Sequence, residues 1–232
     1  MRQDVRMSGS GNELGRAADV MRDVHERCVW TQGMTHEALV PYLVEESAEV
    51  VDAVESGDRA ALREELGDLL WQVLFHAEVA SHHPDEPFGI DDVARGLADK
   101  MIRRHPHVFA GETAETPERV LELWNAAKAA EKRERTSVLD GVSHAMPALA
   151  LAQKVLAKAE LVGVGLELAE EVAAAEAIAE DDPDMLPATE EELGATLLGV
   201  VAIARARGWD AERALRSAVR ALETEVRDAE SG

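Results

Sequence analysis

The chain has 232 residues, of which 46% are hydrophobic and only 3% aromatic, and its formal net charge is −22 at pH 7. So acidic a chain repels nucleic-acid backbones and anionic membrane surfaces, and we expect neither as a partner. The single cysteine, Cys28, excludes an intrachain disulfide and suits a reducing cytoplasm. No run of about 18 apolar residues is present, so no transmembrane helix is expected. No apolar segment follows Met1–Arg6, so we expect no secretory signal.

Ala and Leu dominate the apolar residues, and this composition predicts an all-α fold without strands. Residues 1–12 are polar and rich in Gly and Ser, and they are predicted to form a disordered tail. The rest of the first half predicts five helices, which in chain order cover residues 13–28, 35–56, 58–81, 90–104 and 117–134.

The boundaries of the second and third helices rest on local signals. Thr35 is predicted to cap the second helix, whereas Pro41 argues for a late start or a kink. Gly57 suits the end of that helix, and Asp58 can cap the next one. Gly67 lies inside the third helix, where glycine costs about 1 kcal/mol relative to alanine. The usual reason to keep such a glycine is the close approach of another backbone or of a ligand.

The second half reads as a further helical region that repeats the first. Residues 136–147 are predicted to be a linker, followed by helices near 148–161, 166–180, 189–207 and 210–229, with an exposed loop at 181–184. The stretch Glu64–Asp68 recurs as Glu191–Ala195, and such repetition indicates a duplicated helical unit. Because the acid at 68 has become Ala195, we interpret the second repeat as a degenerate copy that keeps the packing and not the chemistry.

Two pairs of acidic residues lie in apolar stretches of neighbouring helices. Glu46 and Glu49 follow Glu45, and Glu65 and Asp68 occupy the next helix. Residues at i and i+3 share one helix face, so the four carboxylates converge if the helices pack antiparallel. Converging carboxylates repel one another and need a cation, and oxygen-only ligands select Mg²⁺ or Mn²⁺. An isolated acidic pair would more often be solvated surface, because the chain has 46 acidic residues; two pairs flanking one turn favour a metal site.

A basic cluster, Lys100-Met101-Ile102-Arg103-Arg104, closes the helix predicted over 90–104. Lys100 and Arg104 share a helix face, and such cations pair well with phosphate oxygens. The competing interpretation is surface salt bridging. Beside a hard-metal site, however, a cationic face is suited to polyphosphate chemistry.

These stretches together resemble the MazG family of nucleoside triphosphate pyrophosphohydrolases, over about residues 13–232. The resemblance rests on Pro41–Glu46, Glu65–Leu70, Arg103–Phe109, Met146–Leu149 and Ala152–Lys154, together with the spacing of the two acidic motifs. It implies an all-α fold with a four-helix core formed on dimerisation. It also implies cleavage of a nucleoside triphosphate between the α- and β-phosphates, which gives a monophosphate and pyrophosphate. The first repeat, residues 13–135, would be the catalytic domain, and residues 148–232 the degenerate repeat.

The resemblance also implies roles for individual residues. By this resemblance, the Mg²⁺ ligands would be Glu46, Glu49, Glu65 and Asp68, with Glu45 beside them to orient a ligand or activate water. The residues that match the substrate contacts are Lys100, Arg103, Arg104, Trp124 and Lys128, with Trp30 retained near the base. A departure lies at Cys28–Thr31, where the family usually has Cys-Pro-Trp-Asp; the missing Asp puts the base contacts there in doubt.

Two alternatives remain open. The chain could be an acidic helical scaffold or a regulatory binding protein whose metal site is structural or lost, with the degenerate repeat serving dimerisation or a partner. His76, His82 and His83 could also bind zinc, although a histidine pair in a loop without a fixed third ligand is a weak signal. The expected protein is a cytoplasmic, Mg²⁺-dependent enzyme of nucleotide house-cleaning.

Overall fold

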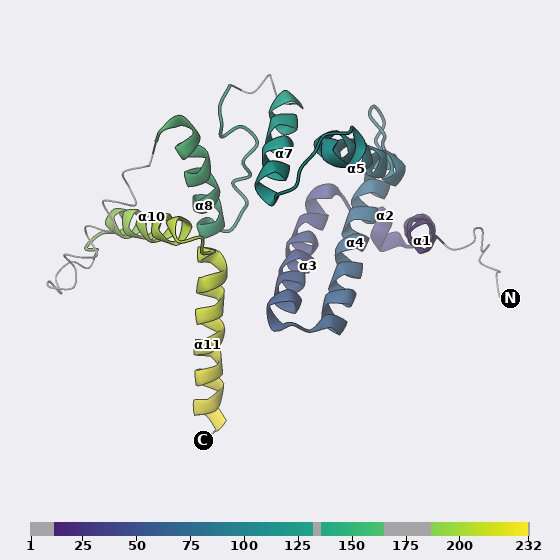
Figure 1. Cartoon of the computed structure of the whole chain (residues 1–232). Helices are drawn as coiled ribbons and strands as arrows, with labels where there is room; N and C mark the ends of the chain where they lie inside the picture. The colour runs from purple at the N-terminus through teal and green to yellow at the C-terminus, as the bar shows by residue number, and fades with distance from the viewer. Residues whose placement is uncertain (1–11, 132–135, 165–186, 232) are drawn as a thin grey trace. The chain divides into compact units, whose positions relative to one another are not determined.

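The computed structural model describes residues 12–131, 136–164 and 187–231, and all regular secondary structure within these ranges is helical (Figure 1). The all-α prediction is therefore confirmed. Residues 1–11 of the tail predicted over 1–12 lie outside the described residues, as do the predicted helix at 166–180 and the predicted loop at 181–184. The chain forms two compact units, Met1–Glu131 and Lys132–Gly232.

The first unit contains long helices together with the short helices α2 and α6. They are α1 (Glu13–Arg27), α2 (Val29–Gln32), α3 (His36–Ser56), α4 (Arg59–Ser81), α5 (Ile90–Arg104), α6 (Pro106–Phe109) and α7 (Pro117–Glu131). The short helices α2 and α6 were not predicted. In α2, the buried Thr31 hydroxyl donates to the carbonyls of Val24 and Cys28, and α6 opens at Pro106, whose fixed φ suits a first helical position.

Helices α3 and α4 form a hairpin and lie side by side (Figure 1). Thr35 caps α3 by accepting a bond from the Ala38 N–H, and Asp58 caps α4 by accepting from Ala60 and Ala61. Between the helices, Gly57 adopts the left-handed conformation with φ 74°, which ends α3 and turns the chain. These three local signals confirm the predicted boundaries.

The late start that Pro41 suggested is wrong, because α3 begins at His36 and includes the proline. Pro41 removes one backbone donor, the one that would bond the carbonyl of Glu37. The Thr35 cap and the packing along α4 outweigh that loss.

The core of the first unit lies at one end of the hairpin. Met21 of α1 and Leu39 of α3 pack with Leu74 and Phe75 of α4, and all four are almost fully buried; Trp71 packs against this cluster. Leu39 is near the start of α3, whereas Leu74 and Phe75 are in the second half of α4. The middle of the hairpin, between this core and the Gly57 turn, is consequently less buried and carries the acidic residues.

The second unit contains α8 (Ala148–Ala159), the short 3₁₀ helix η1 (Glu160–Val162), α10 (Glu190–Ala206) and α11 (Ala211–Ser231). A small core of Leu156, Val201, Ala202, Ala204 and Ala211 joins α8, α10 and α11. The bounds of these helices lie close to the predicted ones. The roles assigned to residues 13–135, 136–147 and 148–232 remain predictions.

Candidate metal centre

Three carboxylates converge on the α3–α4 hairpin. One oxygen from each of Glu46, Glu49 and Glu65 lies within 4.8 Å of the others. Glu46 and Glu65 are half-buried, and Glu49 is exposed. The antiparallel packing that the sequence required therefore brings three of the four predicted ligands together.

The local electrostatics of this cluster favour a bound cation. Burial raises the pKa of Glu46 above its usual value, and the charges of Asp68, Glu49, Glu45 and Glu65 raise it further. Burial likewise raises the pKa of Glu65, followed by the charges of Glu49 and Asp68. Both shifts express mainly the cost of burying a charged carboxylate, and then the repulsion between neighbouring negative charges; a bound cation would lower both costs.

Asp68 and Glu45 belong to the neighbourhood of the cluster, but not to the tight set of three. Both raise the pKa of Glu46 through their charge, and Asp68 also raises that of Glu65. Asp68 and Glu45 are exposed on α4 and α3. The donor set is made of carboxylate oxygens alone, which fits a hard divalent ion such as Mg²⁺.

Gly67 lies between Glu65 and Asp68 and faces open space. A Cβ placed on it would meet no described atom within 4 Å. The close approach of another backbone is therefore not found within the described residues. The interpretation that this glycine makes room for a ligand or a second chain stays a prediction.

The predicted phosphate-binding cations of the basic cluster lie on α5, and the two arginines among them have partners on α7. Arg104 donates two hydrogen bonds to Glu131, of 2.6 and 3.1 Å, and its guanidinium carbon lies 5.1 Å from the centre of the Trp124 ring. Arg103 donates to the same carboxylate at 3.2 Å. The competing interpretation of this cluster, salt bridging, is thus partly realised. The sequence analysis did not single out Glu131. Its pairing with Arg103 and Arg104 of α5 joins residues far apart in the sequence, so no local signal indicated it.

The remaining predicted contacts are distributed over three helices. Lys100 is half-buried on α5, one turn before Arg104, and makes no hydrogen bond or ion pair within the described residues. Lys128 is half-buried on α7, one turn after Trp124. Trp30 of α2 is half exposed and packs edge-on against Tyr42, with 6.0 Å between ring centres.

The histidines considered for zinc each have a separate partner. The Nδ1 atoms of His76 and His36 lie 2.8 Å apart, and His82 bonds Glu78 at 3.2 Å. His83 Nδ1 accepts bonds from the backbone N–H groups of two loop residues that follow it. The structure does not bring these three histidines together as one ligand set within the described residues.

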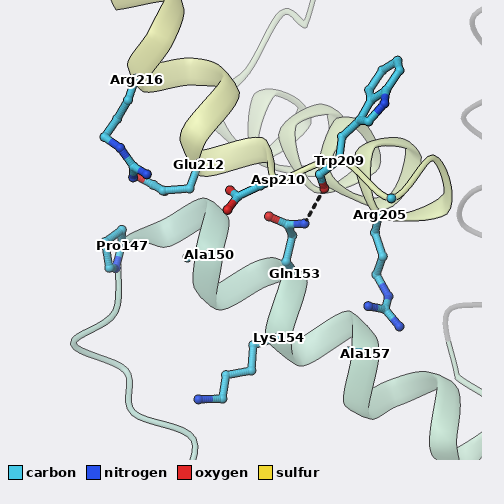
Figure 2. Close-up of a pocket in the computed structure, with 11 residues that line it drawn as sticks. Pro147, Ala150, Gln153, Lys154, Ala157, Arg205, Trp209, Asp210, Glu212 and Arg216 are labelled. Carbon is cyan, nitrogen blue, oxygen red and sulfur yellow. Dashed lines mark hydrogen bonds and ion pairs between the residues drawn. The ribbon is translucent and has the colours of Figure 1, made fainter. Parts of the chain in front are cut away.

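A cavity of about 560 Å³ lies in the second unit, between α8 and the connection from α10 to α11 (Figure 2). Its acidic residues already have structural partners: Asp210 accepts from the Arg213 N–H, and Glu212 pairs with Arg216 at 3.4 Å. Figure 2 shows Lys154 and Arg205 pointing in different directions from the cavity. This cavity therefore lacks the converging carboxylates that distinguish the α3–α4 hairpin.

The region that contains the hairpin matches a known protein family. Residues 34–109 match the MazG nucleotide pyrophosphohydrolase domain, and this range contains the acidic cluster of the hairpin, Glu45, Glu46, Glu49, Glu65 and Asp68. A protein of Escherichia coli strain K12 named nucleoside triphosphate pyrophosphohydrolase is 35% identical over 236 residues, covering 94% of this chain and 88% of that protein.

Two further proteins are also similar. A Streptomyces cacaoi protein, described as an uncharacterized 26.1 kDa protein in the blaB 3′ region, is 43% identical over 95% of this chain and 84% of that protein. A Mycolicibacterium smegmatis nucleoside triphosphate pyrophosphohydrolase is 46% identical over 68% of this chain. That match covers 49% of the M. smegmatis protein, which is about half of its length.

Proposed function

The chain belongs to the MazG family of nucleoside triphosphate pyrophosphohydrolases, and we propose that it hydrolyses nucleoside triphosphates to monophosphates and pyrophosphate with Mg²⁺ bound at the α3–α4 hairpin. The observation that carries this proposal is the convergence of Glu46, Glu49 and Glu65 within 4.8 Å. We assign Asp68 as the fourth ligand on the resemblance of the motif, and its charge acts on both Glu46 and Glu65, which supports its place beside the cluster. Mn²⁺ could replace Mg²⁺, since both prefer oxygen ligands.

Hydrolysis of the triphosphate requires an activated water molecule as nucleophile and a stabilised pyrophosphate leaving group. When bound, Mg²⁺ would neutralise phosphate charge and lower the pKa of a water molecule. Either Glu45 or Glu49 accepts the proton as the water oxygen bonds the α-phosphorus. The bond from that phosphorus to the bridging oxygen breaks in line, and pyrophosphate leaves.

The cations of α5 and α7 act on the leaving phosphates. Lys100 has no carboxylate partner within the described residues, so its ammonium group is available to a phosphate oxygen. Arg103 and Arg104 supply further donors, and Trp124 and Lys128 cover the nucleotide from α7. Trp30, half exposed on α2, is the aromatic side chain we assign to the base.

We also propose that two copies of the chain associate through the hairpin. Val40 and Val44 on α3 and Leu66 on α4 are half exposed or more, and Val73 on α4 is 40% exposed. Each pair recurs at helical spacing, which forms an apolar face on each helix. Burying these faces against a second hairpin would produce the four-helix core that the resemblance implies.

The second unit is proposed to be structural. Ala195 stands on α10 where Asp68 stands on α4, so a cation there would lose a carboxylate ligand.

Family membership favours the enzyme over the scaffold alternative for the chain as a whole. No described helix has the length and apolar character to span a membrane. The physiological role we propose is cytoplasmic nucleotide house-cleaning, without nucleic acid or membrane as partner.

The proposal is tested by pyrophosphate release from a panel of ribo- and deoxyribonucleoside triphosphates, with Mg²⁺ and with EDTA. We expect release only with metal, and a loss of kcat on the order of 10²-fold or more in Glu49→Ala. Glu37→Gln is the matched control, since Glu37 is an exposed acid in the first turn of the same helix, outside the cluster. Full activity in EDTA, or in Glu49→Ala, would contradict the assignment of the site.

A further inference from the structure

Glu131, the last residue of α7, binds two arginines of α5 with one carboxylate. Its Oε1 accepts from the Nε of Arg103 at 3.2 Å. Its Oε2 accepts from both Nε and Nη2 of Arg104, at 3.1 and 2.6 Å. The side chain of Arg104 is only 11% exposed and that of Glu131 21%, so this pair is more shielded from water than an ordinary surface ion pair, whereas Arg103 is 57% exposed.

The guanidinium of Arg104 also lies over an aromatic ring. The guanidinium carbon lies 5.1 Å from the Trp124 ring centre, and the His105 ring contacts the same tryptophan edge-on, with 5.1 Å between centres. Arg104 is thus held by the Glu131 carboxylate and lies over the ring of Trp124.

This arrangement leaves one edge of Arg104 available. A guanidinium has five N–H donors in a planar fork. Glu131 takes the Nε donor and one donor of Nη2, and no other carboxylate bonds Arg104 within the described part of the chain. The donors of Nη1 and the second donor of Nη2 remain, and two such donors match two oxygens of a phosphate.

We propose that Glu131 is a positioning residue for the hydrolysis: it orients Arg104 so that the free edge of the guanidinium binds the triphosphate of the substrate. This inference rests on the proposed function. An arginine already held in one rotamer loses less conformational freedom when a phosphate binds, so preorganisation raises affinity. The bond from Arg104 also holds the pKa of Glu131 below its usual value, so its carboxylate stays charged near neutral pH.

The opposite role for Glu131 would be competition with the substrate. A competing carboxylate would have to leave both arginines before a phosphate could bind. The geometry favours positioning, because Glu131 bonds the Nε side of Arg104 and does not cover the Nη1 side.

The test combines Glu131→Ala and Arg104→Lys, singly and together, in the full-length chain. Arg104→Lys keeps the charge but removes the fork. We measure kcat and KM for the best triphosphate of the panel, the Kd of a non-hydrolysable triphosphate analogue by calorimetry, and Tm. Glu122→Gln is the control, because Glu122 lies on the same helix, is exposed and pairs with Arg119 at 2.9 Å.

We expect Glu131→Ala to raise both KM and the Kd of the analogue by about tenfold, as loss of an orienting partner does at other sites. In the Arg104→Lys background the same change should have little further effect, because no fork remains to be oriented. Glu131→Gln should be intermediate, since its amide oxygen still accepts a bond. Glu122→Gln should leave KM and Kd unchanged.

Three results would overturn the inference. A lower KM in Glu131→Ala would show competition with the substrate. An equal rise in KM in both backgrounds would mean that Glu131 does not act through Arg104. A fall in Tm with unchanged Kd would make its role purely structural. If the wild type binds the analogue but releases no pyrophosphate, the proposed reaction fails while the Kd comparison still tests Glu131; if it binds no analogue, both proposals fail.

Discussion

Glu46 of α3 and Glu65 of α4 bring carboxylate oxygens within 4.8 Å of one another across the hairpin, and both have pKa values raised by burial and by neighbouring acids. The folded chain thus holds negative charges closer than the unfolded chain does. The hairpin stores a repulsion that a divalent cation would remove.

Metal binding is therefore expected to stabilise the fold. At a free Mg²⁺ concentration about 100 times Kd, binding to the folded state alone contributes about 2.7 kcal/mol. Glu46→Gln should abolish the Mg²⁺-induced rise in Tm, and in EDTA it should melt above the wild type because one repelled charge is gone. Thermal melts with EDTA and with increasing Mg²⁺ measure both effects, and a wild-type Tm that ignores Mg²⁺ would contradict the site.

Association through the hairpin predicts that a charge on its apolar face produces monomers. Val44 is 61% exposed and Leu66 50% exposed. Changing either to Glu would bury an unpaired charge in the dimer while costing the monomer little. Light scattering after size exclusion measures the mass; Val20→Glu, at an exposed position on α1, is the control, and a Leu66→Glu protein that remains dimeric would argue for a different interface.

Gln153 joins α8 to the turn before α11. Its Nε2 donates to the Trp209 carbonyl at 2.9 Å, and its Oε1 accepts from the Ala211 N–H at 3.0 Å. Gln153→Ala should therefore lower the free energy of unfolding of the second unit by about 1–3 kcal/mol, since both backbone groups lose their partner. Urea denaturation followed by circular dichroism measures this cost, with the exposed Lys154→Ala as neighbour control. Unchanged turnover beside this loss would agree with a structural second unit.

Glu160 makes the stability of the second unit depend on pH. Two hydrogen bonds from Arg205, of 2.6 and 2.9 Å, hold the pKa of Glu160 below its ordinary value of 4.5. The unfolded chain binds this proton at a higher pH than the folded chain does. The contribution to stability is therefore present above pH 4.5 and is lost as the pH falls through the lowered pKa.

The comparison that tests this is Glu160→Gln against wild type in urea at pH 7 and at successively lower pH. The wild type should be the more stable protein at pH 7, and the difference should shrink on acidification. A difference that does not depend on pH would mean that the Arg205 ion pair contributes through its geometry and not through its charge.

Local signals in the sequence determined most of the helices. Thr35 and Asp58 satisfy the first free N–H groups of their own helices, and Gly57 adopts a backbone conformation that other residues rarely take. These effects act within a few residues, so they can be predicted without knowing the rest of the chain. The spacing of Glu46 with Glu49 likewise places both acids on one helix face.

Contacts between helices were decided only by the tertiary structure. The core around Phe75 sets how α1, α3 and α4 pack, and thereby which carboxylates meet: Glu65 enters the tight set and Asp68 remains beside it. Arg104 could be predicted as a basic residue on one face of α5, but not as the partner of Glu131. Helix propensity and capping depend on neighbours in sequence, whereas such pairings depend on distances that packing between helices determines.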